Sequence, residues 1–184
     1  MLSAAEINRS LRGAWLLFLG REEGLQALDR SVDGFWRSFA VIVLVLPLTA
    51  ISVVAVTRGD PDRAFSDIFL SQIPLLLLDW VIFPLVMALV ARPLGVSAHY
   101  VSYVVARNWA APITAAILTV PLVLEGAGFL PVEGANLLSI IALLMVLYYH
   151  FRVLRLALKT PVSLSIGLVV ADFCVTMVLI GMFG

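Results

Sequence analysis

Residues 38–57, SFAVIVLVLPLTAISVVAVT, form a stretch without a single charged side chain. A helix of about 20 apolar residues crosses the hydrocarbon core of a bilayer, which is about 30 Å thick. The same property recurs at residues 108–124, which carry no charge, and at residues 134–151, where His150 is the only candidate charge. Repeated stretches of this length are typical of a polytopic membrane protein.

The composition of the chain excludes other classes. Hydrophobic residues make up 62% of the 184 residues and charged residues 13%, against about 45–50% and about 25% in soluble domains. Cys174 is the only cysteine, which excludes a disulfide-stabilised secreted scaffold. The 12 Lys and Arg residues balance the 12 Asp and Glu residues, which excludes nucleic-acid binding through a basic surface.

Five segments are long and apolar enough to span a membrane, and turn-forming residues separate them. We place them near residues 35–57, 66–91, 98–124, 134–158 and 161–183. The predicted fold is therefore all-α, with an amphipathic N-terminal helical region over residues 1–33 and a five-helix transmembrane bundle over residues 34–184.

The basic residues predict an orientation. Leaving aside the intramembrane Arg107, nine flank one side of the bundle: Arg9, Arg12, Arg21, Arg30, Arg37, Arg92, Arg152, Arg155 and Lys159. Only Arg58 and Arg63 flank the other side. The positive-inside rule then predicts a cytoplasmic N-terminus and an external C-terminus. Eleven of the twelve basic residues are arginine, which is typical of a GC-rich genome and favours a bacterial inner membrane with a periplasmic C-terminus.

The N-terminal region has the pattern of an interfacial helix. Ser3 and Glu6 have the spacing of a capping box. A helix over residues 4–19 would align Ile7, Leu11, Ala14, Trp15 and Phe18 on one stripe. This pattern predicts a helix at the membrane interface with Trp15 at headgroup level, and packing under the bundle is the alternative. A second short helix is expected over residues 22–30, and Trp36 would anchor the first span.

Three ionisable residues fall inside the predicted spans, namely Asp79, Arg107 and Asp172. Each must be paired or hydrated, because a bare charge in hydrocarbon is costly. At 1.5 Å per residue they lie about 14–18 Å from the N-terminal side of the bundle, so we expect one buried ionic cluster. The other polar residues near that depth are Asn108, Tyr148 and His150.

Two interpretations of this cluster stay open. A structural Asp–Arg pair would fix the register of the helices. A proton or solute path would instead use an aspartate that changes charge on protonation. Two acids facing one arginine leave one negative charge over, which favours one aspartate holding a proton at rest.

A basic face ends the fourth predicted span, formed by Arg152, Arg155 and Lys159 at i, i+3 and i+7. Snorkelling towards the interface is the ordinary interpretation, and contact with anionic lipid headgroups is the alternative. We expect no metal site, because the two histidines and one cysteine have no partner at ligand spacing. No cofactor is expected. The nucleotide-binding, zinc-protease and hydrolase motifs are absent as well, so we expect no enzyme.

Residues 20–39, GREEGLQALDRSVDGFWRSF, lead into the first span. With the five-span outline, this segment resembles the Yip family of Rab-interacting membrane proteins and its bacterial relatives. The Asp-Leu-Tyr-Gly-Pro motif of the eukaryotic members is absent, so the resemblance transfers neither Rab binding nor any functional residue. It implies a non-enzymatic membrane protein that works through helix contacts with partners.

The sequence thus predicts first a scaffold, assembly or regulatory factor for other membrane components, which contacts lipids and either a membrane-protein partner or further copies of itself. The alternative is a small transporter or channel for protons or a solute that uses Asp79, Arg107 and Asp172.

Overall fold

The computed structural model describes residues 2–59 and 64–183, and these residues form helices and no strand. The elements are α1 (Ala4–Phe18), η1 (Glu22–Ala27), α2 (Val32–Phe39), α3 (Ile42–Gly59), α4 (Phe65–Ala91), η2 (Ser97–His99), α5 (Tyr100–Gly126), α6 (Val132–Leu158) and α7 (Val162–Phe183). The all-α prediction is confirmed.

Five helical segments are long and apolar enough to cross a membrane, as the sequence predicted for an integral membrane protein. They are Val32–Arg58, Phe65–Ala91, Ser97–Gly126, Val132–Leu158 and Val162–Met182. The first of them is not one continuous helix. The chain turns at Ala40 and Val41, whose N–H groups bond the carbonyls of Arg37 and Ser38, three residues back. The predicted span therefore divides into α2 and α3. Of the two basic residues expected on the far side, Arg63 lies outside the described residues.

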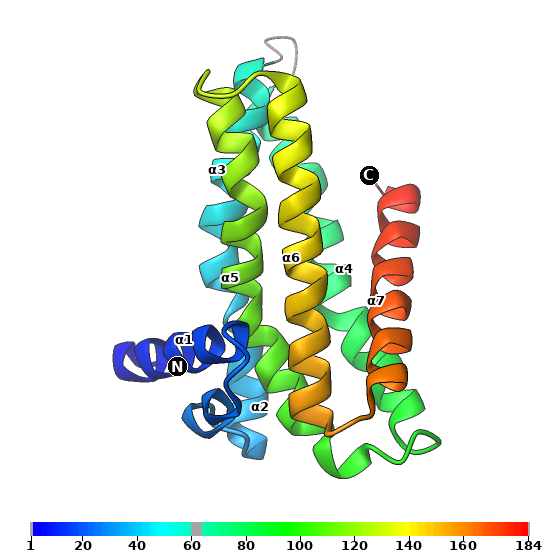
Figure 1. Cartoon of the computed structure of the whole chain (residues 1–184). Coiled ribbons are helices and arrows are strands. Elements are labelled where there is room, and N and C mark those ends of the chain that lie inside the picture. The colour runs from blue at the N-terminus through cyan, green and yellow to red at the C-terminus, as the bar shows by residue number, and fades with distance from the viewer. Residues whose placement is uncertain (1, 60–63, 184) are drawn as a thin grey trace.

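The long helices run alternately up and down (Figure 1). We call the end with α1, η1 and α2 the basal end, and the end where α5 connects to α6 the distal end. The helix α5 is central, since it packs against α3 and α6 and also contacts α1, α2 and α4. The last helix, α7, packs against α4 and α6. Arg107 and the core residues of α5 therefore lie where several helices meet.

The N-terminal helix α1 lies across the basal part of the bundle (Figure 1). Its N-cap is the expected one, with the Ser3 hydroxyl accepting from the Glu6 N–H at 3.1 Å. The buried face consists of Ser10, Gly13, Ala14 and Leu17. It belongs to the same core as the spans, so this face of α1 packs against the bundle.

The residues of the predicted apolar stripe of α1 differ in their burial. Ala14 is buried, and Ile7, Leu11 and Phe18 are half-buried against the core, but Trp15 is 49% exposed. The reason is that bundle contacts select the narrower, small-residue face of the helix, one step of about 100° away from Trp15. Trp15 and the 68%-exposed Trp36 remain free to lie at a membrane interface. The short helix expected over residues 22–30 is shorter than predicted: it is the 3₁₀ helix η1, which ends at Ala27, because the backbone is extended at Leu28.

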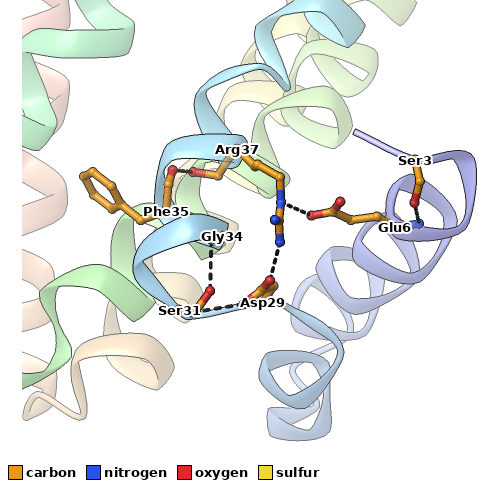
Figure 2. Close-up of polar contacts among 8 residues, drawn as sticks. Ser3, Glu6, Asp29, Ser31, Gly34, Phe35 and Arg37 are labelled. Carbon is orange, nitrogen blue, oxygen red and sulfur yellow. Dashed lines mark hydrogen bonds and ion pairs between the residues drawn. The ribbon is translucent and has the colours of Figure 1, made fainter. Parts of the chain in front are cut away.

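Arg37 ties the N-terminal elements together (Figure 2). Its Nε donates to Oε1 of Glu6 on α1 at 3.0 Å, and its Nη2 pairs with Asp29, which precedes α2. Asp29 also accepts the N–H of Ser31 at 3.0 Å. The hydrogen bonds from Ser31, together with the charge of Arg37, lower the pKa of Asp29 below its usual value. The N-terminal region is thus fixed to the start of the first span.

Candidate functional site

Arg107 is the centre of a buried ionic cluster. Its Nη2 lies 3.3 Å from Oδ2 of Asp79 on α4 and 3.3 Å from Oδ1 of Asp172 on α7. The Arg107 side chain is 9% exposed and that of Asp172 is 8% exposed, whereas that of Asp79 is 31% exposed. The structure therefore joins α4, α5 and α7 through the three residues expected from the sequence, and one carboxylate remains accessible.

Two further side chains complete the cluster. Nδ1 of His150, on α6, lies 3.2 Å from Oδ2 of Asp172. The Thr176 hydroxyl donates to Oδ1 of Asp79 at 3.1 Å and lies 3.1 Å from the main-chain oxygen of Asp172. Four helices thus supply the cluster, and both aspartates have a second polar neighbour besides Arg107. These neighbours reduce the cost of keeping the carboxylates away from water.

Sequence reasoning missed Thr176 and Phe83. Thr176 is four residues after Asp172, and Phe83 is four residues after Asp79. The guanidinium of Arg107 lies over the Phe83 ring, 5.3 Å from its centroid, which is a cation–π distance. Residues four apart share a helix face. The four-residue spacing from each intramembrane aspartate could therefore have predicted that Phe83 and Thr176 lie near the cluster.

Two expected neighbours of the cluster lie elsewhere. Asn108 is fully buried, and its Nδ2 donates to the Ser38 hydroxyl at 2.9 Å, on the side facing α2. Successive helical residues point about 100° apart, so Asn108 points away from Arg107's partners. Tyr148 is 57% exposed on the outside of α6. Depth in the membrane was predicted for these residues, but helix rotation was not.

The three residues of the basic face of α6 have different surroundings in the structure. Nη2 of Arg152 donates to the main-chain oxygen of Gly20 at 2.5 Å, and its Nη1 lies 3.4 Å from the Tyr148 hydroxyl. Arg152 therefore holds the loop after α1 instead of pointing freely outward. Arg155 and Lys159 are exposed, so they alone remain available to lipid headgroups in the manner expected from the sequence.

A cavity of about 680 Å³ opens above the cluster, towards the distal end. All five spans line it, with the ionic cluster at its basal limit. On α5 the lining runs from Arg107 to Leu122, which corresponds to about 22 Å at 1.5 Å per residue. Its volume lies within the range of about 300–1,000 Å³ that is usual for small-molecule sites. Its walls are mainly aliphatic, and the charged groups lie together at its basal end.

The basal half of the bundle is closed in contrast. Large side chains fill it, with Phe83, Met87, Tyr103, Tyr149 and Leu154 each 2% exposed or less. Residues of α1 continue the same core. The cluster thus separates a closed basal half from a hollow distal half, and a solute in the cavity would reach Asp79 without crossing packed side chains.

No group of His, Cys, Asp and Glu within the described ranges 2–59 and 64–183 is arranged to hold a metal ion. The chemistry that the cluster offers is proton binding and charge pairing. Comparisons with protein-family models, curated proteins and solved structures find no match for this chain.

Proposed function

We propose that this protein carries a small solute across the membrane, with the cavity as the solute site and the cluster as a proton-binding site. The observation that supports this most is the position of the cluster. Asp79, Arg107, His150 and Asp172 all line the same cavity. A purely structural ion pair needs no cavity beside it, whereas a carrier needs a site that water and solute can reach.

The charge balance gives the cluster two states. With His150 neutral, two carboxylates and one guanidinium leave a formal charge of −1. A proton taken up by the cluster makes it neutral, and a neutral cluster is cheaper to hold inside a membrane. Because the groups are in contact, the proton belongs to the cluster as a whole and not to one residue. Proton uptake and release can therefore be linked to solute binding.

The asymmetry of the bundle supports a carrier that is open towards the distal side only. The distal half is hollow and the basal half is packed. Access from the basal side requires a rearrangement of helices around the cluster. The helix that can move most simply is α7, which packs against α4 and α6 and contributes Asp172 and Thr176. Its movement would require breaking the contacts of Asp172 with Arg107 and His150 and the hydrogen bond from Thr176 to Asp79.

The orientation and location remain part of the proposal. The positive-inside rule places the basal end in the cytoplasm of a bacterial cell and the cavity on the periplasmic side. The relationship to Yip proteins is proposed on topology and the segment before the first span. The scaffold role, which the sequence favoured first, leaves the cavity without a use. It therefore becomes the competing hypothesis.

Transport can be tested in liposomes that contain the purified protein and a pH-sensitive dye. A pH gradient is imposed, and small cationic, neutral and anionic amphiphiles are added in turn. We expect at least one of them to cause protein-dependent proton movement. Asp79→Asn should abolish this movement while the protein folds normally, because the asparagine Oδ1 can still accept from Thr176. Asp67→Asn is the matched control, since Asp67 is exposed at the start of α4, outside the cavity.

The competing hypothesis predicts a different result. If Asp79 serves only a structural ion pair, Asp79→Asn should lower expression or the unfolding temperature. The wild-type protein should then move no protons with any amphiphile beyond empty liposomes. That pair of results would exclude the carrier and favour the scaffold.

A further inference from the structure

The most accessible group at the base of the cavity is an acid. The Asp79 side chain is 31% exposed, compared with 24% for His150, 9% for Arg107 and 8% for Asp172. Arg107 already contacts both carboxylates, so its charge is shared between two partners. A solute that descends the cavity therefore meets a carboxylate first. The formal charge of −1 on the cluster likewise favours a cationic solute.

The hydroxyl groups of the cavity wall are already engaged as donors. Those of Thr49, Thr114 and Thr119 donate to main-chain oxygens of their own helices. Ser52 donates to the main-chain oxygen of Leu48 and lies 2.8 Å from the Thr119 hydroxyl. Such hydroxyls retain lone pairs but have no spare hydrogen. These hydroxyls consequently offer acceptors, which suit a donor or a cation, while Gln72 in the same wall carries an amide that can donate or accept.

An aromatic residue directly follows each aspartate of the cluster. Trp80 follows Asp79, Phe173 follows Asp172, and both aromatic side chains line the cavity. Trp80 is 5% exposed, and its Nε1 has no hydrogen-bond partner among the described residues. Carboxylates combined with aromatic side chains are a common setting for organic cations. The remaining wall, which includes Leu76, Leu118 and Leu147, suits an apolar body.

We propose that the cavity binds a monovalent organic cation with an apolar body, and that the cation and a proton compete for the cluster. This inference deepens the proposed carrier function and depends on it for its physiological meaning. The cation would place its charge at Asp79 and its apolar part among the aliphatic residues of the distal wall. The proton that it displaces would leave through the cavity. The charge of the cluster and its occupant is then zero both before and after the exchange.

The competition involves every titratable group around Asp79. Within residues 2–59 and 64–183, these are Arg107 and Tyr103 on α5, His150 on α6 and Asp172 on α7. The sequence of α3 contributes only Arg58, at its distal end. Arginine stays charged throughout the physiological range. The competing proton is therefore held by the rest of the cluster as a unit, and cation binding should strengthen as the pH rises.

The sign of the charge can be tested with tetraphenylphosphonium and tetraphenylborate, which share one shape and carry opposite charges. Equilibrium binding of each is measured with the full-length protein in lipid nanodiscs, after subtraction of binding to empty nanodiscs. We expect saturable binding of the cation alone, stronger at alkaline pH, with release of about one proton per cation. Asp79→Asn should weaken binding about tenfold or more, as loss of one charge-assisted contact implies. Asp67→Asn should leave binding unchanged.

Each other outcome overturns the inference. Saturable binding of the anion alone would show that Arg107 and not Asp79 governs the site. Equal binding of both ions would show that charge does not select the occupant. Absence of saturable binding for both ions would show that the cavity is not an organic-cation site. Cation binding that is independent of pH would exclude competition with a proton. The liposome assay, which uses amphiphiles of all three charge types, decides separately whether the protein transports anything.

Discussion

The Tyr149 hydroxyl donates to the main-chain oxygen of Ala14 at 2.6 Å, and both residues are fully buried. This bond attaches α1 to the basal half of α6. Tyr149 directly precedes His150, which contacts the ionic cluster. The N-terminal helix and the cluster are therefore supported by neighbouring residues of one helix.

Replacement of Tyr149 by phenylalanine tests this attachment. Tyr149→Phe keeps the ring but leaves the Ala14 oxygen buried without its partner, which costs about 1–3 kcal/mol. We expect faster amide exchange over Ala4–Phe18 and a lower unfolding midpoint in detergent. Tyr148→Phe is the matched control, because Tyr148 is exposed and its hydroxyl makes only a long contact of 3.4 Å, with Nη1 of Arg152. Equal exchange in both variants would contradict the attachment.

The contact between α1 and η1 depends on two glycines. A Cβ atom at Gly13 would lie 2.7 Å from the Gly24 oxygen and 2.9 Å from the Ala27 Cβ. Gly13→Ala should therefore separate the two elements and destabilise the protein by about 1–3 kcal/mol, the usual cost of overpacking. Protease sensitivity of the segment between α1 and α2 would report the change.

Gly167 supplies the control for that substitution. A Cβ atom at Gly167 on α7 meets no atom within 4 Å. Gly167→Ala should raise the unfolding midpoint or leave it unchanged, because alanine favours a helix over glycine by about 1 kcal/mol. The same loss of stability in both variants would show that the close packing at Gly13 is unimportant.

Arg107 should be the most sensitive position in the membrane-spanning part. Arg107→Gln leaves the two aspartates without a cation, and breaking a buried pair in this way costs about 3–5 kcal/mol. We expect loss of folded protein in detergent. Adding Asp172→Asn should restore much of it, because it removes the more deeply buried of the two uncompensated charges. Arg92→Gln, at an exposed position after α4, should fold like the wild type. Failure of the second substitution to rescue folding would mean that packing of the guanidinium, and not its charge, is required.

Acidification should loosen the N-terminal elements. The pKa of Asp29 is lowered in the folded protein by the Ser31 hydrogen bonds and by Arg37. A lowered pKa means that the stabilisation is complete above the unfolded value of about 3.9 and is lost as the pH falls through the lower, folded value. Amide protection over η1 and α2 should therefore persist down to about pH 4 and then decline. Asp29→Asn should show weaker protection that no longer changes over this range, and an unchanged acid response in that variant would assign the effect to other carboxylates.

The sequence by itself determined the helical fold and the five spans, because hydrocarbon imposes both the length and the apolar composition of each span. It also predicted that Asp79, Arg107 and Asp172 share one depth, since rise per residue along a helix is constant. Depth says nothing about rotation. Only the packing of the helices decided that His150 and Thr176 face the cluster while Asn108 faces Ser38 and Tyr148 faces outward. The cavity likewise depends on how far α3, α4, α5, α6 and α7 stay apart above Arg107. That separation results from side-chain contacts between residues far apart in the chain, and no local pattern of the sequence encodes it.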